Sequence, residues 1–255
     1  MSLATERLNR LPAAERGITI GDFLVPLAVG ERISTRARHV ALVVAGAIVI
    51  ALTANIGLAL QGQTILLPGD VRVTLPTSPV PITAQTFSVL LVGGALGFRR
   101  AILAVALYLA LGLLLPVYAG GSSGLDTFLA REEGRWVFGA TGGYLLGFLL
   151  AGAVVGRLAE LGWDRQVGGA VVAMLLGNLA IYLVGIPWLM AATGFDLSTA
   201  IAKGLAPFVF GDLLKLALAG IAFPVAWWIV GRRTGERCAA PAAAPRSGPG
   251  RAPPR

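Results

Sequence analysis

The chain has 255 residues, of which 56% are hydrophobic and only 13% charged, with a formal net charge of +8 and a mean hydropathy of +0.77. Soluble globular domains carry about 25% charged residues, so this composition excludes an ordinary water-soluble domain and indicates an integral membrane protein. The basic residues flank apolar segments, which favours a role in membrane topology over nucleic-acid binding. With one cysteine and one histidine, neither an intramolecular disulfide nor a classical metal centre is expected.

The first 39 residues are mixed in composition and are expected to form a cytoplasmic or interfacial segment. They begin too polar for a standard signal peptide. Residues 18–30, ITIGDFLVPLAVG, are apolar enough to lie on the membrane surface. Because they are short and contain Pro26, they are not expected to span the membrane.

Charge-free apolar windows predict six membrane-spanning helices, since about 20 such residues cross a bilayer. In chain order the windows cover residues 40–60, 73–98, 101–115, 141–161, 167–190 and 205–230. Pro76, Pro79 and Pro81 interrupt the second window, so its helix is expected to begin only near residues 83–85. The predicted fold is an all-α membrane protein, with a bundle of six transmembrane helices in a membrane domain over residues 40–231.

The basic residues of the short connections predict the orientation of this bundle, because such loops favour the cytoplasmic side. They precede the first window, lie between the second and third and between the fourth and fifth, and follow the sixth: Arg32, Arg36, Arg38, Arg99, Arg100, Arg157, Arg165, Arg232, Arg233 and Arg237. Both termini are therefore predicted to be cytoplasmic, in a multi-pass protein of the cell membrane. Residues 232–255, rich in Pro, Ala and Gly, are expected to be a disordered tail.

The connections on the opposite side are longer and rich in turn residues. They cover residues 68–86, 116–144 and 192–203. Loops of this length are more often functional than simple connectors. Because non-helical backbone at membrane depth is tolerated only where it is buried in protein or lines a cavity, a small-molecule site that opens outward is expected.

An aspartate and a lysine, Asp212 and Lys215, interrupt the sixth window, which is otherwise uncharged from Gly204 to Gly231. Residues three apart share a helix face, and each charge costs about 2.5–3.5 kcal/mol at the centre of a spanning helix. Two interpretations remain open: a salt bridge within the helix, or a ligand or transport site. A carboxylate accepts hydrogen bonds and an ammonium donates them. A ureido, amide or pteridine-like head with N–H donors and a carbonyl would therefore satisfy both.

Other polar and aromatic residues are candidates for the same pocket: Thr83, Gln85, Tyr118, Tyr144, Asn178 and Tyr182. Simpler roles are open to several of them, such as an interfacial anchor for Tyr182 or an interhelical hydrogen bond for Asn178. In the first window Ala41 and Ala45 are four apart, a spacing that permits close approach of another helix. The chain has no GxxxxGK[ST] loop, so ATP-driven transport would require another polypeptide.

Five segments resemble the BioY family, the biotin-binding S subunits of energy-coupling-factor (ECF) transporters. In order they are PVPITAQTFSVLLVGGALG, YLALGLLLPVYAGG, ATGGYLLGF, GNLAIYLVGIPWL and GLAPFVFGDLLK, within residues 40–230. The resemblance implies a six-helix bundle that captures biotin from outside, with no cofactor and no enzymatic activity. Its implied partners are biotin, membrane lipid, a transmembrane coupling subunit and a pair of cytoplasmic ATPases, and not nucleic acid. Ala41 and Ala45 would lie on the helix that docks on the coupling subunit.

The resemblance also implies roles for the charged pair, because the ureido ring of biotin has two N–H groups and one carbonyl. Asp212 is assigned to an N–H and Lys215 to the carbonyl, while backbone N–H groups of Gly120 and Gly121 meet the valerate carboxylate. The reverse orientation, with Lys215 on the carboxylate, stays open. So does a different class of function, a solitary ion-coupled transporter of biotin or a related vitamin. The chain departs from the family at Ala140, where proline is common, and in a long loop at 122–138.

Overall fold

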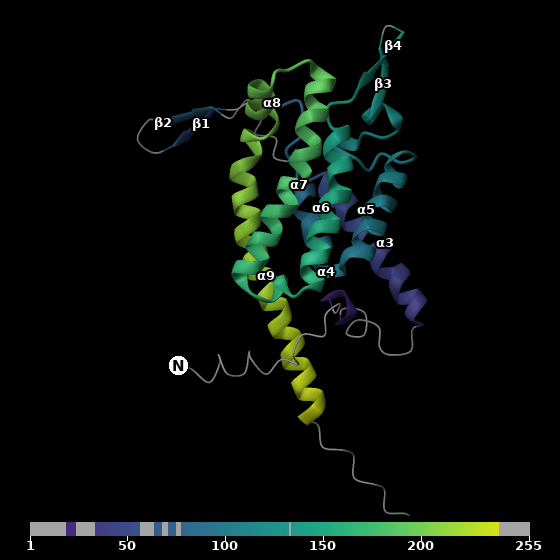
Figure 1. Ribbon diagram of the computed structural model, residues 1–255, viewed down its shortest axis with the longest axis vertical. Helices are drawn as coiled ribbons and strands as arrows, with labels where there is room; N and C mark the ends of the chain where they lie inside the picture. The colour runs from purple at the N-terminus through teal and green to yellow at the C-terminus, as the bar shows by residue number, and fades with distance from the viewer. Residues whose placement is uncertain are drawn as a thin grey trace, which may run out of the picture.

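Long helices packed side by side form the body of the protein (Figure 1). The computed structural model describes residues 19–23, 34–56, 64–67, 71–74, 78–132 and 134–239. The main helices are α3 (Thr35–Ala54), α4 (Gln85–Leu96), α5 (Phe98–Gly112), α6 (Gly142–Glu160), α7 (Val167–Thr193) and α9 (Ala206–Ala239). In this bundle α6 packs against α7, α4 and α5, α3 packs against α4 and α5, and α9 packs mainly against α7.

These helices lie at the six predicted positions, but the count of six spans is not confirmed. Among the described residues, four helices are long and apolar enough to cross a membrane: α3, α6, α7 and Gly211–Val230 of α9. Helix α4 has 12 residues and α5 has 15, fewer than the about 20 that a span requires. Helix α4 begins at Gln85, as the proline pattern predicts, after the irregular segment 78–84.

The two ends of the bundle differ in their connections (Figure 1). At one, here called the elbow end, α4 turns directly into α5 at Gly97, and the 3₁₀ turn η3 (Trp163–Arg165) joins α6 to α7. Gly97 has a φ of 80°, a left-handed conformation that favours glycine. The other, here called the loop end, carries longer connections. They contain the hairpins β1 (Thr64–Leu67)–β2 (Val71–Thr74) and β3 (Leu129–Glu132)–β4 (Arg135–Phe138), the turns η1 (Ala119–Gly121) and η2 (Leu125–Thr127), and helix α8 (Leu197–Gly204).

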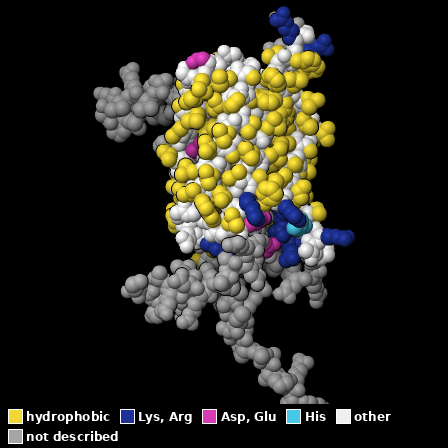
Figure 2. Space-filling view, in the orientation of Figure 1, with side chains coloured by type: hydrophobic (Ala, Val, Ile, Leu, Met, Phe, Trp, Pro, Cys, Tyr) yellow, Lys and Arg dark blue, Asp and Glu magenta, His cyan; other side chains and the backbone are white. Residues whose placement is uncertain are grey.

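In the view of Figure 2 most charged side chains lie at the two ends of the bundle, with a broad and largely apolar band between them. Such a band is what a lipid-embedded bundle requires, since the bilayer core has no water to solvate charge. The assignment of the elbow end to the cytoplasm stays a prediction. Helix α9 continues to Ala239, past the predicted domain boundary at residue 231, and residues 1–18 and 240–255 lie outside the described part.

Near the N-terminus, residues 19–23 pack on the elbow end of the bundle. A carboxylate oxygen of Asp22 lies 2.7 Å from the guanidinium of Arg100 on α5, and the ring of Phe23 meets that of Trp227 on α9 edge-on, with centroids 6.0 Å apart. Burial alone would raise the pKa of Asp22, but hydrogen bonds within the segment and from Arg100 outweigh it and hold that pKa below its usual value. This segment therefore links α5 to α9.

A second carboxylate is buried at the elbow end. Asp164 of η3 is only 3% exposed and accepts a hydrogen bond of 2.7 Å from the indole N–H of Trp227. The guanidinium of Arg165 lies over the same indole, 4.8 Å from its centroid. Burial is the largest influence on this carboxyl and raises the pKa of Asp164 to about 6.

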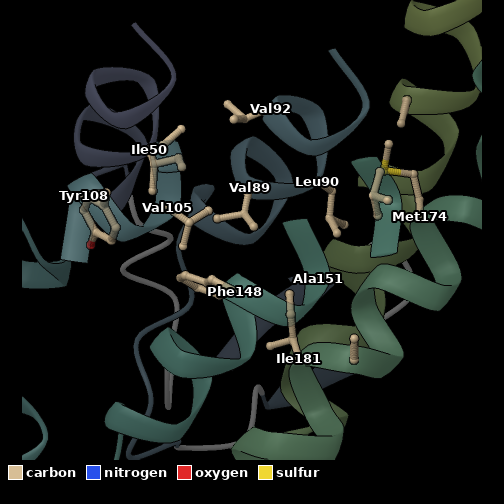
Figure 3. Close-up of a cluster of buried hydrophobic side chains, with 14 of the residues drawn as sticks. Ile50, Val89, Leu90, Val92, Val105, Tyr108, Phe148, Ala151, Met174 and Ile181 are labelled. Carbon is tan, nitrogen blue, oxygen red and sulfur yellow. The ribbon is translucent and has the colours of Figure 1, made fainter. Parts of the chain in front are cut away.

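The core is an apolar cluster that runs through the middle of the bundle (Figure 3). Val89 and Leu90 of α4, Val105 of α5 and Phe148 of α6 are almost fully buried. Ile181 of α7 is also buried and, like Phe148, forms part of the wall of a cavity at the loop end. The cavity thus rests on the rigid packing of the core.

Candidate ligand-binding site

A cavity of about 150 Å³ opens among the loop-end parts of α4, α6, α7 and α9. Most of its wall is apolar or aromatic, and hydroxyl and amide groups interrupt that wall at several points. Its lining consists of Pro79, Val80, Pro81, Thr83, Gln85, Thr86, Tyr118, Ala119, Ser122, Thr127, Thr141, Tyr144, Leu145, Phe148, Asn178, Ile181, Tyr182 and Phe208. An apolar pocket with a few placed polar groups is typical of a small-molecule site.

The lining residues differ in depth because of where they lie on their helices. Helix α7 runs from the elbow end to the loop end, so Asn178, the twelfth of its 27 residues, lies near mid-bundle. Ser122, Thr127 and Thr141 belong instead to the connections at the loop end. The cavity therefore has an amide at depth and several hydroxyls near its mouth.

Helical spacing explains how two walls are built. Asn178, Ile181 and Tyr182 are three and four residues apart on α7, and Tyr144 and Phe148 are four apart on α6. Residues at these spacings lie on one helix face. The sequence analysis predicted the polar and tyrosine members of both sets. It missed Phe148 and Ile181, although their helical spacing to the predicted residues indicated the same face.

Asp212 and Lys215 lie just behind the cavity wall, where they bond to groups that line it. Asp212 is 7% exposed and accepts a 2.5 Å hydrogen bond from the hydroxyl of Tyr182. The ammonium of Lys215 donates to the hydroxyl of Thr86 at 2.6 Å and to the backbone carbonyl of Thr83 at 3.4 Å. The pair therefore reaches the cavity through Tyr182 and Thr86.

The same two residues also form the salt bridge that sequence reasoning left open. Lys215 Nζ lies 3.4 Å from Asp212 Oδ1. Both charges are thus compensated within the protein, as burial requires. The hydroxyls of Tyr182 and Thr86 thus lie between the pair and the cavity.

Gln85, at the start of α4, is 3% exposed and lines the cavity. Its amide nitrogen donates to the hydroxyl of Tyr108 on α5 at 2.6 Å, and that hydroxyl donates to the carbonyl of Val117 at 3.4 Å. Tyr108 is fully buried. Tyr108 therefore holds the Gln85 amide in place from behind the cavity wall, a role that the sequence did not indicate.

Tyr118 closes the cavity on the side of the long connection. Its hydroxyl donates to the carbonyl of Leu109 at 2.7 Å, and its ring lies against Gly112, where a Cβ would be 2.0 Å from the ring. Only glycine at position 112 allows this contact. Burial raises the pKa of the Tyr118 hydroxyl.

Tyr144 forms an aromatic part of the cavity wall together with Phe208 of α9. Its hydroxyl donates to the carbonyl of Gly204 at 2.8 Å, and its ring stacks on Phe208 with centroids 6.3 Å apart. The ring of Tyr182 meets it edge-on at 6.4 Å. Gly185 makes room for the ring of Tyr144, because a Cβ at position 185 would lie 2.7 Å from that ring.

Four other predicted residues lie outside the cavity lining. Gly120 and Gly121 have φ values of 71° and 72°, are exposed, and stand between two lining residues of the same turn. Ala41 and Ala45 are exposed on α3, on a face open to lipid or a partner helix. Their roles as carboxylate-binding and docking residues remain predictions.

Several lining residues were not predicted at all: Thr86, Ser122, Thr127, Thr141 and Phe208. Thr86 follows Gln85 directly, and helical periodicity alone does not place it opposite a lysine 129 positions away. Ser122, Thr127 and Thr141 lie in a long connection whose course has no simple periodicity. Only the folded chain brings these hydroxyls together.

Comparison with known proteins identifies the family. A family model described as the BioY family matches residues 30–232. The chain is 35% identical over 149 residues to the biotin transporter BioY2 of Lactococcus lactis subsp. cremoris, an alignment that covers 58% of this chain and 76% of the relative. It is 35% identical over 150 residues to the biotin transporter BioY of Thermotoga maritima, covering 58% of this chain and 82% of that protein.

A solved structure has the same fold. It is the S-component for biotin from an ECF-type ABC transporter, with a TM-score of 0.58 at 24% sequence identity, covering 80% of this chain and 95% of that one. The family match leaves residues 1–29 and 233–255 outside, so it includes every lining residue of the cavity and both members of the buried charged pair. This chain belongs to the BioY family.

Proposed function

We propose that this chain is the substrate-binding S component of an ECF-type biotin transporter. It captures biotin on the outer side of the cell membrane, and separate ATPase subunits energise its uptake. The observation that carries the proposal is a loop-end cavity with aromatic walls, backed by the buried pair Asp212 and Lys215, in a member of a family of transporters rather than enzymes.

The chemistry of biotin suits the two ends of this cavity. Asn178, Tyr182 and, behind it, Asp212 offer an amide, a hydroxyl and a carboxylate at depth, which match a ureido group with two N–H donors and one carbonyl. The bicyclic ring and thioether would lie against the aromatic wall. Lys215, now bonded to Thr86, would donate to the ureido carbonyl.

The valerate carboxylate would then point toward the mouth, where Ser122, Thr127 and Thr141 present hydroxyls. A charged carboxylate is far cheaper to keep near water than to bury at mid-membrane, which supports this orientation. Biotin amide, in which the carboxylate is neutralised, tests it. Binding close to that of biotin would agree with a carboxylate at the mouth, whereas a loss as large as that caused by Lys215→Met would favour the reverse orientation.

The function itself is tested by equilibrium binding to the purified chain in lipid nanodiscs. Calorimetry should detect saturable binding of biotin, and the variant Tyr182→Phe, which removes the hydroxyl between the cavity and Asp212, should bind more weakly. Absence of biotin binding to folded protein would refute the proposal. Uptake that persists without any ATPase subunit and collapses with an uncoupler would instead indicate an ion-coupled carrier.

Docking of the coupling subunit is proposed for the exposed face of α3. Ala41 and Ala45 give this face a low profile on which another helix can pack closely. Ala45→Trp should abolish co-purification with the coupling subunit and preserve biotin binding. Unchanged co-purification would rule out this face.

We further propose that the chain crosses the membrane six times, and that the irregular segment 78–84 helps the short α4 to cross.

A further inference from the structure

The hairpin β3–β4 projects from the loop end of the bundle (Figure 1). In its antiparallel register Leu129 pairs with Phe138 and Arg131 pairs with Trp136. Alternate residues of a strand point to the same face, so these four side chains share one face of the hairpin. That face combines two aromatic rings, a leucine and a guanidinium.

The base of the hairpin is attached to α7. The ring of Phe138 meets that of Trp188 with centroids 4.8 Å apart, and the indole N–H of Trp188 donates to the carbonyl of Gly139 at 2.8 Å. The backbone N–H of Gly139 in turn donates to the carbonyl of Phe128. These contacts set the direction in which the hairpin leaves the bundle.

In the part of the chain that the structure describes, large apolar side chains on this hairpin and just before it are exposed, including Phe138 at the base. Trp136 is 67% exposed and Phe138 is 43% exposed, and Leu125, just before the hairpin, is 67% exposed. The guanidinium of Arg131 lies over the Trp136 indole, 5.9 Å from its centroid. Clustered exposed apolar side chains of this size indicate a contact surface.

The apolar band of the bundle continues into this hairpin, and basic side chains lie beyond it at the outermost edge (Figure 2). An apolar bundle that ends in an indole with a guanidinium beside it suits a membrane protein whose edge meets the headgroup region and the lipid phosphates. We propose that the β3–β4 hairpin is an interfacial anchor: Trp136 and Phe138 lie in the headgroup region of the leaflet that the loop end faces, and Arg131 binds phospholipid phosphate.

Two features define this anchor further. Over residues 131–135 the sequence has two arginines and two glutamates, so the formal charges of this stretch cancel and the anchor does not depend on anionic lipid. The connection that carries the hairpin also contributes Thr127 and Thr141 to the cavity mouth. Attachment of the hairpin to the membrane surface therefore holds this side of the mouth in place, whatever ligand the cavity binds.

Fluorescence quenching tests the proposal with the full chain in phosphatidylcholine vesicles. Because the chain has five tryptophans, the emission of Trp136 is taken as the difference between the native chain and Trp136→Phe. That emission should lose most of its intensity when the lipid is brominated near the glycerol backbone, and less when bromine is near the acyl ends. Aqueous iodide should quench it weakly.

A matched variant, Trp227→Phe, reports a buried indole that is 8% exposed and should show little quenching by iodide. Emission of Trp136 that iodide quenches fully and brominated lipid leaves unchanged would overturn the anchor. Quenching by brominated lipid only when anionic lipid is added would overturn the role of the charge-balanced stretch 131–135. Neither result requires biotin binding, so the outcome is independent of the proposed transport function.

Discussion

The pair Asp212 and Lys215 allows a prediction that separates structure from ligand binding. The variant Lys215→Met keeps the length of the side chain and removes its charge, so Asp212 is left buried without its counter-ion. At the observed 3.4 Å and an effective dielectric constant of about 20, the lost attraction is about 5 kcal/mol. Because truncating one partner of a buried pair costs about 3–5 kcal/mol, Lys215→Met should lower the free energy of unfolding by roughly that amount.

The double variant Asp212→Asn/Lys215→Met removes both charges and should recover much of the loss. The asparagine can still accept the hydrogen bond from Tyr182. Unfolding is followed by tryptophan fluorescence in detergent for the native chain, both single variants and the double variant. This double-mutant cycle should give a coupling free energy of about 1–3 kcal/mol between the two side chains. If the two single losses simply add in the double variant, the electrostatic reasoning is wrong.

Biotin binding by the same four proteins distinguishes the two interpretations of the pair. If the charged pair binds the ligand, the double variant should be nearly as stable as the native chain and should nevertheless bind biotin much more weakly. Native-like affinity in a stable double variant would show that the pair is only a salt bridge, and would refute its assignment to the ureido group.

Further predictions concern three other sites. Because burial raises the pKa of Asp164 from 3.8 to about 6, the stability linked to it is full below about pH 3.8 and is lost as the pH rises through 6. The free energy of unfolding should therefore fall by about 3 kcal/mol between these two pH values. Asp164→Asn should flatten this pH dependence of unfolding, and an unchanged slope in the variant would show that Asp164 is not its cause. Gly112→Ala places a Cβ 2.0 Å from the Tyr118 ring and should cost about 1–3 kcal/mol in thermal unfolding, together with affinity for biotin; native values of both would show that the ring adapts. Asp22→Asn loses the ionic bond to Arg100 and should cost about 1–3 kcal/mol at neutral pH. Because the pKa of Asp22 is held low, that penalty should disappear only below its folded pKa, and an equal penalty in strong acid would exclude an ionic origin.

The positions of the helices were predictable because hydropathy is a local property. Each predicted window corresponds to a helix, and the three prolines correctly predicted that α4 begins only near Gln85. The buried charges were also visible, since Asp212 and Lys215 stand alone in a long apolar stretch. Order and spacing of motifs were enough to indicate the family, which the family match over residues 30–232 confirms.

By itself, then, the sequence determined the helical membrane character, the order of the helices and the presence of an unusual charged pair within an apolar helix. Only the tertiary structure decided which groups meet in it. Lys215 bonds to Thr86, 129 positions away, and Gly120 and Gly121 lie beside the cavity rather than in its wall. The physical reason is that apolar periodicity constrains each helix separately, whereas the neighbours of a polar side chain depend on how several helices and irregular connections pack together.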